Sequence, residues 1–242
     1  MGKEDKALID VENVSKSFNN KILFEDVNFS VYDKEILGIL GYSGEGKSSL
    51  LNILTGVESI DTGSVKYHYK DKILDINSCH NSFIKELIGY STQEPSIYDE
   101  LSLVENIEFY ASLLEVEEKE MKKRVKTLLE IFNLENYQEK KGKDLSVGQK
   151  KRLDLACSLI HNPKILILDE PTANLDFKLR EDILKYIKTI NKLGVTIIYV
   201  SHFIEEIEEL SKRVLMINDK KCKVVDNVNL KKNFLNFAKK NE

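Results

Sequence analysis

Apolar and polar residues alternate along the first part of the chain. Two alternating runs, at residues 8–11 and 22–31, flank a polar turn at residues 18–21. Alternation at every second position puts apolar side chains on one face of a strand. The pattern therefore predicts an antiparallel hairpin. It is followed by an apolar strand at residues 36–40.

The apolar spacing becomes helical between residues 101 and 134, which predicts a helical insertion that extends to a helix holding Leu153 and Ile160. Two nearly continuous apolar runs follow, at residues 165–168 and 195–200. Such runs are typical of parallel strands covered on both faces. Polar residues end both runs, at the strand edge where open α/β sheets bind ligands.

The tail at residues 229–242 has apolar residues on one helical face and lysines elsewhere. This predicts a surface helix packed on its own domain, with a membrane surface or a partner as the alternative contact.

Composition narrows the class of protein. With 242 residues and 42% hydrophobic content, the chain can bury one substantial core with a subdomain attached. The net charge of −4 gives no electrostatic case for nucleic acid, so none is expected as a partner. No apolar stretch approaches the roughly 18 residues of a membrane span, and no signal-peptide core follows the charged start, so a cytosolic chain is expected.

The cysteines are Cys79, Cys157 and Cys222, far apart and without C-x-x-C spacing. They predict reduced, structural thiols. The histidines His68, His80 and His161 form no metal-ligand pattern with them, so no zinc site is expected.

A glycine-rich segment at residues 41–48 fits the pattern G-x-x-x-x-G-K-[ST] of a phosphate-binding P-loop. Glycines accept positive φ, so backbone N–H groups can turn toward an anion. Lys47 would reach the β and γ phosphates, and Ser48 would offer its hydroxyl to Mg²⁺. A short pattern also occurs in ordinary surface turns, so the loop alone does not decide the function. The predicted nucleotide contacts here are Gly41, Tyr42, Ser43, Gly44, Glu45, Gly46, Lys47, Ser48 and Ser49.

A second motif, Leu-Ser-Val-Gly-Gln at residues 145–149, lies about 20 residues before Asp169. It resembles the signature of ATP-binding cassette (ABC) ATPases, commonly Leu-Ser-Gly-Gly-Gln. The resemblance covers essentially the whole chain, with the motifs in the family's order. By this resemblance the positions outside the P-loop are the adenine-stacking Phe18, the Q-loop Gln93, the signature residues Ser146, Gly148 and Gln149, the Walker B Asp169 with Glu170 after it, the D-loop at 173–176 and the switch His202.

The resemblance implies an α/β fold of the P-loop NTPase, ABC ATPase type: a mostly parallel core sheet, an N-terminal antiparallel β subdomain and an inserted α-helical subdomain. The expected boundaries are a core at 7–93 and 163–226, a helical subdomain at 94–162 and a C-terminal helix at 227–242.

The implied ligands are ATP and Mg²⁺. Two such domains would pair head to tail, as a homodimer for this chain, with each ATP between one P-loop and the partner's signature. Ser146 and Gly148 would then touch the γ-phosphate held by the other copy, helped by the helix that begins there. His202 would contact the γ-phosphate of its own site.

The chemistry of hydrolysis assigns other roles. It requires charge neutralisation and a positioned water. Lys47 serves the first need, together with Mg²⁺ held by Ser48, Gln93 and Asp169. The carboxylate of Glu170 would orient or deprotonate the attacking water.

Several residues depart from the family pattern. Val147 replaces the first signature glycine, and a β-branched residue does not adopt positive φ cheaply. Ala173-Asn174 and Phe177 are unusual in and after the D-loop. Glu45 is expected to face away from the phosphates, because an acid facing them would oppose binding.

Segments 97–107 and 201–210 resemble transporter ATPases, most closely those of the drug and polysaccharide export subfamily. This implies a separate integral membrane permease, whose cytoplasmic helix docks between the Q-loop and the helical insertion. The chain would then be peripheral on the cytoplasmic face of the membrane. The alternatives are an importer ATPase, a soluble ABC ATPase of translation, repair or iron–sulfur assembly, and a module that binds ATP without turnover.

Overall fold

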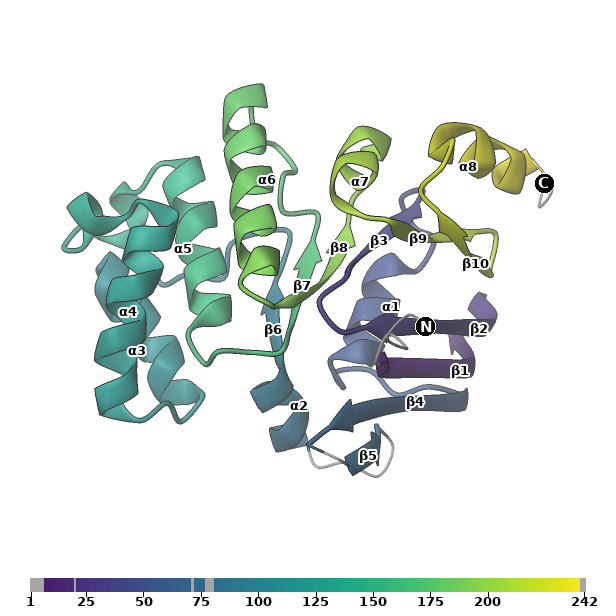
Figure 1. The fold of residues 1–242 in the computed structure, drawn as a ribbon, viewed down its shortest axis with the longest axis horizontal. Helices are drawn as coiled ribbons and strands as arrows, with labels where there is room; N and C mark the ends of the chain where they lie inside the picture. Colours follow the sequence, from purple (N-terminus) through teal and green to yellow (C-terminus); the bar gives the residue numbers. More distant parts are fainter. Residues whose placement is uncertain (1–6, 20, 71, 77–80, 240–242) are drawn as a thin grey trace, which may run out of the picture. The chain divides into compact units, whose positions relative to one another are not determined.

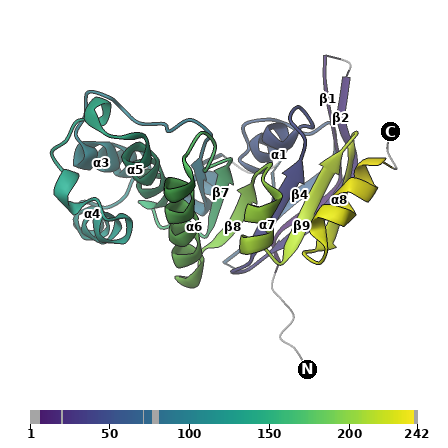
Figure 2. The ribbon, with the colours of Figure 1, turned by 90° about the horizontal axis from the view of Figure 1, so that it is seen from above.

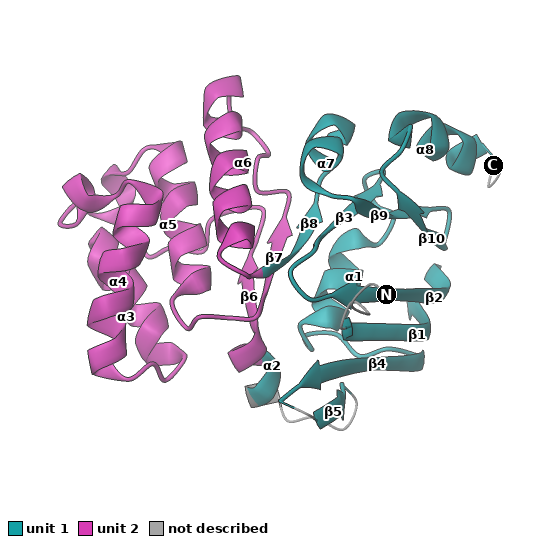
Figure 3. Cartoon of the chain, in the orientation of Figure 1, with its two compact units in different colours: residues 1–84, 196–242 teal, residues 85–195 magenta. Residues whose placement is uncertain are grey.

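The computed structural model describes residues 7–19, 21–70, 72–76 and 81–239. The chain divides into two compact units, residues 1–84 with 196–242 and residues 85–195 (Figure 3). The second unit therefore joins the predicted helical subdomain to residues 163–195, which the sequence assigns to the core. The subdomain boundaries given above remain a prediction.

The first unit contains an antiparallel sheet built on the predicted hairpin (Figure 1). Its strands, in the order β2-β1-β4-β5, are β1 (Ala7–Phe18), β2 (Lys21–Tyr32), β4 (Thr62–Tyr69) and β5 (Lys72–Asp75). Phe18 pairs with Lys21 at the predicted turn of the hairpin. Gly63 lets β4 lie close to β1, because a Cβ at this position would collide with the carbonyl oxygen of Asn13.

A second group of strands in this unit is β3 (Ile36–Gly41), β8 (Thr196–Val200), β9 (Arg213–Asn218) and β10 (Lys221–Asp226). Strand β3 runs parallel to both β8 and β9, and β10 is antiparallel to β9. All residues of β3 and β8 are buried, in keeping with their continuous apolar sequence.

Three helices belong to the same unit: α1 (Lys47–Leu54), α7 (Ile204–Leu210) and α8 (Leu230–Lys239). Helix α8 lies along β9 in both views (Figures 1 and 2) and contacts that strand. It buries Leu230, Phe234 and Ala238, the apolar face seen in the sequence. The tail thus packs on its own unit.

In the second unit, β6 (Ile88–Ser91) and β7 (Ile165–Asp169) form a parallel pair. The helices of the predicted insertion are α3 (Leu103–Leu113), α4 (Glu118–Phe132) and α5 (Val147–Leu159), followed by α6 (Phe177–Lys192). Helix α2 (Asn81–Leu87), strand β5 and the 3₁₀ turns at Glu135–Tyr137 and Gly142–Asp144 were not predicted.

Within the described ranges, every helix is too short or too polar to cross a bilayer. Cys157 and Cys222 are both free thiols, as predicted, whereas Cys79 and His80 lie outside the described residues.

Candidate functional site

The glycine-rich loop joins β3 to α1 in the first unit. Gly44 and Gly46 adopt φ of 85° and 86°, the left-handed conformation that favours glycine. Gly41 does not, so the predicted reason for this glycine is wrong. A Cβ on Gly41 would lie 2.8 Å from the carbonyl oxygen of Ile217, and the close approach of β9 therefore requires a glycine here.

Helix α1 begins at Lys47 with its N-terminal N–H groups directed to the loop. Gly46 is the N-cap, no side chain caps the helix, and its first turn contains no acidic residue. Lys47 is buried, and its ammonium donates hydrogen bonds to the carbonyl oxygens of Gly41 (3.0 Å) and Tyr42 (2.9 Å). An anion at this position would meet both a helix N-terminus and a lysine.

Glu45 is directed at the turn after β9. Its carboxylate accepts a hydrogen bond from the backbone N–H of Asp219, at 2.7 Å. The Glu45 carboxylate is thus hydrogen-bonded to the turn after β9. This agrees with the expectation that Glu45 does not face the phosphates.

His202 follows β8, the strand that lies beside β3. Ile39 pairs with Val200, and the N–H of Ser201 donates to the carbonyl oxygen of Ile39 (3.3 Å). The phosphate loop and His202 therefore leave the carboxyl ends of two neighbouring parallel strands. His202 itself is exposed. The structure thus brings together two segments that are about 150 residues apart.

The turn that carries His202 is anchored by Glu206, a buried acid that sequence reasoning missed. Its Oε2 accepts hydrogen bonds from the hydroxyls of Ser201 (2.8 Å) and Tyr199 (2.6 Å). The acid-rich sequence of α7 gave no sign of which glutamate points inward.

Phe18 lies at the end of the β1–β2 hairpin and is 65% exposed. It is not part of the apolar core, so its ring is free to stack on a flat ligand. The adenine-stacking role remains a prediction.

In the second unit, strands β6 and β7 are parallel neighbours, and Ser91 pairs with Leu168. Gln93 lies two residues after the end of β6, and Asp169 is the last residue of β7. Asp169 is buried, whereas Gln93 is exposed. Burial and the negative charge of Asp169, which is hydrogen-bonded to Tyr90, raise the pKa of the Tyr90 hydroxyl to about 12. Tyr90 is therefore a neutral donor that holds the Asp169 carboxylate.

Glu170 adopts φ of 46°, which is uncommon for a residue other than glycine. Its carbonyl oxygen accepts a hydrogen bond from the N–H of Ala173 (3.1 Å). A strained backbone of this kind is frequent at functional positions.

The signature segment forms the start of α5. Ser146 is its N-cap, in a capping box with Gln149: the N–H of Gln149 donates to Ser146 Oγ (3.3 Å), and the N–H of Ser146 donates to Gln149 Oε1 (2.9 Å). The Gln149 side chain is thus engaged in the cap, and its contact with nucleotide remains a prediction.

Val147 is the first residue of helix α5 and is 62% exposed. The concern that a β-branched residue must adopt positive φ here is wrong, because this position is helical. Gly148 lies close to helix α6: a Cβ would lie 2.6 Å from a methyl group of Leu179, which would have to shift.

The predicted donors for Mg²⁺ are the Ser48 hydroxyl, the Gln93 amide oxygen and the Asp169 carboxylate. No cluster of three or more His, Cys, Asp or Glu side chains suited to a metal occurs among the described residues. The predicted Mg²⁺ donors are instead one hydroxyl, one amide oxygen and one carboxylate. Mg²⁺ prefers such oxygen donors and usually combines them with phosphate oxygens. The donor chemistry therefore fits.

These features define a P-loop nucleotide-binding protein of the α/β class. Residues 24–173 match the profile of the ABC transporter family. The chain belongs to this family and has its P-loop ATPase fold, with mixed α/β sheets and a helical subdomain, as predicted.

Similar curated proteins include two import proteins and a resistance protein. The sulfate/thiosulfate import ATP-binding protein CysA of Halalkalibacterium halodurans is 34% identical over 89% of this chain and 60% of its own length. The methionine import protein MetN of Clostridium acetobutylicum is 36% identical over 87% of this chain and 66% of its own length. The linearmycin resistance protein LnrL of Bacillus subtilis is 31% identical over 87% of this chain and 66% of its own length. The chain thus spans three-fifths to two-thirds of these relatives.

Among solved structures, CbiO1 of Clostridium perfringens, part of the transporter complex CbiONQ, has a TM-score of 0.84 and 28% identity, covering 97% of this chain and 93% of its own. A dimeric, post-hydrolysis structure of the cassette MJ0796 with ADP and Pi has a TM-score of 0.78 and 26% identity, covering 92% and 100%.

Proposed function

We propose that the chain is the ATP-binding and ATP-hydrolysing subunit of an ABC transporter and works through a separate membrane permease. The observation that carries the proposal is the phosphate loop, where an uncapped helix N-terminus and the ammonium of Lys47 lie at one strand end. Family membership supports ATP as the ligand.

The roles proposed for the residues follow from their chemistry. Lys47 would neutralise charge on the phosphates, and His202 would contact the terminal phosphate. Ser48, Gln93 and Asp169 would hold Mg²⁺, which when bound supplies positive charge to the phosphate oxygens. Glu170 would orient the attacking water and take its proton, while Tyr90 keeps the Asp169 carboxylate in place. Of these residues, Lys47, Ser48 and His202 belong to the first unit, and Gln93, Asp169 and Glu170 to the second.

A second copy of this chain is the proposed partner for hydrolysis. The chain has one phosphate loop and one signature segment, and MJ0796 is dimeric with ADP and Pi. Ser146 and Gly148 of one copy would contact the phosphates held by the other. The N-terminus of α5, capped by Ser146, would then direct its dipole at the anion.

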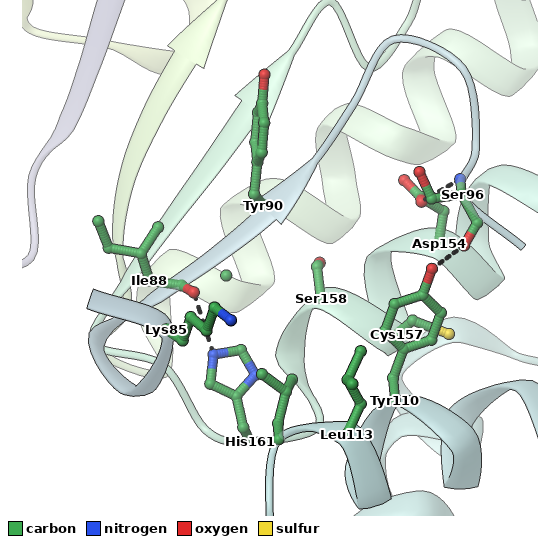
Figure 4. A pocket seen from close by; sticks show the side chains of 12 residues that line it. Lys85, Ile88, Tyr90, Ser96, Tyr110, Leu113, Asp154, Cys157, Ser158 and His161 are labelled. Carbon is green, nitrogen blue, oxygen red and sulfur yellow. Dashed lines mark hydrogen bonds between the residues drawn. The ribbon is translucent and has the colours of Figure 1, made fainter. Parts of the chain in front are cut away.

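The proposed permease contact is a pocket of about 280 Å³ in the second unit. Its lining combines the apolar Leu113 and Leu114 with the polar Ser96 and Tyr110 (Figure 4). Leu113 is 65% exposed, which suits a site for an amphipathic helix. This location agrees with the docking groove expected between the Q-loop and the helical insertion.

The export direction predicted from segments 97–107 and 201–210 is not supported by the relatives, because CysA and MetN are import proteins and only LnrL is a resistance protein. Import of a solute is therefore the second candidate. Transport of either kind would place the chain at the cytoplasmic face of the membrane through its permease.

Two measurements test the proposal. The purified chain should release phosphate from ATP in a Mg²⁺-dependent manner, and affinity purification from native membranes should recover an integral membrane protein. Recovery of an active ATPase without such a protein would favour a soluble ABC machine. ATP binding without any phosphate release, alone or with the permease, would identify a binding-only module and overturn the proposed hydrolysis.

A further inference from the structure

The loop that carries Gln93 is tied to helix α5 by two buried charged side chains. Asp154 accepts hydrogen bonds from the Ser91 hydroxyl (2.5 Å) and, through its other oxygen, from the backbone N–H of Ser96 (3.0 Å). Lys151 donates to the carbonyl oxygen of Thr92 (2.8 Å). One turn of α5 therefore holds the loop on both sides of Gln93.

The two charges form an ion pair in the protein interior. The Lys151 ammonium lies 3.6 Å from an Asp154 carboxylate oxygen, and each residue is only 3% exposed. Burying a pair of charges is expensive, and apolar residues of similar size often stabilise a fold as well or better. Stability alone therefore gives no reason for this pair, whereas its hydrogen bonds to the loop do.

The same carboxylate also lines the pocket proposed for the permease. Asp154, Ser96 and Tyr110 all face this pocket, and the Tyr110 hydroxyl donates to the carbonyl oxygen of Ser96 (Figure 4). Ser96 is thus held by Asp154 at its N–H and by Tyr110 at its carbonyl. A ligand in the pocket would touch the groups that fix the end of the loop.

We propose that Lys151 and Asp154 are positioning residues that hold the segment 91–96 on helix α5, so that Gln93 keeps a fixed place relative to the signature residues at the start of that helix. The proposal rests on the role assigned to Gln93 under the proposed function. The hydrogen bonds of the pair go to Ser91, Thr92 and Ser96, so it would act through the loop. Its loss should slow turnover and leave nucleotide binding at the phosphate loop nearly intact, because misplacement of about 1 Å can slow a reaction by roughly 100-fold.

The main test replaces the pair by apolar residues, Lys151→Met with Asp154→Leu, which removes the hydrogen bonds to the loop without leaving a lone buried charge. The matched control is Glu118→Leu with Lys122→Met, an exposed ion pair within helix α4. Lys151→Arg, which keeps a charge and a donor, is the conservative variant. Readouts are the equilibrium Kd for ATP, kcat and KM for phosphate release, and hydrogen exchange of a peptide spanning residues 92–98.

The expected result for the main variant is a kcat lower by about 10- to 100-fold, an ATP Kd within about threefold of the wild type, and faster exchange in residues 92–98 with α5 still protected. The single variant Lys151→Arg should retain most of the wild-type rate, and the Glu118→Leu with Lys122→Met control should match the wild type. Unchanged exchange with an unchanged kcat would overturn the proposal. So would a parallel loss of affinity, rate and α5 protection, which indicates a purely structural role.

Ser91→Ala gives an independent test if the double variant does not fold, because it removes one hydrogen bond and no charge. Faster exchange in residues 92–98 with a reduced kcat supports the proposal, and unchanged exchange opposes it. If the wild type itself releases no phosphate, the proposed function fails. The exchange measurement still decides whether the pair holds the loop.

Discussion

The rings of Tyr42 and Phe234 pack against each other, with centroids 5.1 Å apart and planes inclined at 52°. Tyr42 is the second residue of the phosphate loop, and Phe234 belongs to the C-terminal helix α8. The apolar face of α8 was predicted from its sequence, but the contact with the phosphate loop was not. It joins residues about 190 positions apart, which no local pattern records.

Phe234→Ala should lower the free energy of unfolding by about 3 kcal/mol, because removing a buried aromatic ring forfeits its burial and leaves a cavity. Phe234 is 4% exposed, whereas the neighbouring Leu235 is 45% exposed. Leu235→Ala is therefore the control and should change stability by less than about 1 kcal/mol. Urea denaturation measures both, and equal losses would show that α8 does not pack through Phe234.

The glycines of the phosphate loop should respond to alanine for two different reasons. Gly44→Ala would place a Cβ in open space but at φ of 85°, so a loss of about 1–2 kcal/mol is expected. Gly41→Ala would instead force a Cβ to 2.8 Å from a backbone oxygen of β9, and a larger loss is expected. Thermal denaturation of the two variants checks the order, and a larger loss for Gly44→Ala would contradict the close-approach explanation.

Glu170→Gln should bind ATP with nearly wild-type affinity and release phosphate more slowly by about 10²- to 10⁴-fold, because an amide cannot accept a proton from water. Phosphate release and ATP binding are measured in parallel. Glu205→Gln, which neutralises an exposed acid on α7, is the control and should leave the rate unchanged. Wild-type turnover by Glu170→Gln would remove this residue from the proposed chemistry.

The sequence predicted the elements whose causes are local. The hairpin and the buried strands follow from apolar periodicity, polar residues stand where the runs of β7 and β8 end, and the structure has all of these. Tertiary contacts escaped prediction. The buried Asp154 and Lys151 look like solvated charges in the sequence of α5, and their role depends on a loop that packs there. The reason for Gly41 was missed in the same way.

Val147→Gly, which restores the family's usual signature, should lower the free energy of unfolding by up to about 1 kcal/mol. Val147 is helical and exposed, so glycine would relieve no strain and would increase the conformational entropy of the unfolded chain. Chemical denaturation measures the effect, with Val147→Ala as the control that keeps a helix-forming residue. A stabilised glycine variant would show that Val147 is strained after all.

His161 should make the stability depend on pH. The pKa of the His161 ring is lowered from 6.5 to about 4, mainly by burial. The nearby Arg124 also lowers this pKa, whereas the hydrogen bond to the Ile88 carbonyl raises it. The neutral ring donates from Nε2 to the Ile88 oxygen (3.2 Å). Between pH 6.5 and 4 the unfolded chain therefore binds a proton that the folded chain does not. The contribution of His161 to the free energy of unfolding is fully present above pH 6.5. It falls by about 3 kcal/mol in total as the pH drops toward 4, and it does not change further below that pH.

Comparison with His161→Gln isolates this contribution, because glutamine can still donate to the Ile88 oxygen and does not titrate. Urea denaturation of both proteins from pH 7 to pH 4 gives the difference in unfolding free energy at each pH. The wild type should lose more stability than the variant across this window, whereas other groups contribute equally to both. Parallel curves would mean that His161 titrates normally, and hence that its ring is not held neutral against β6.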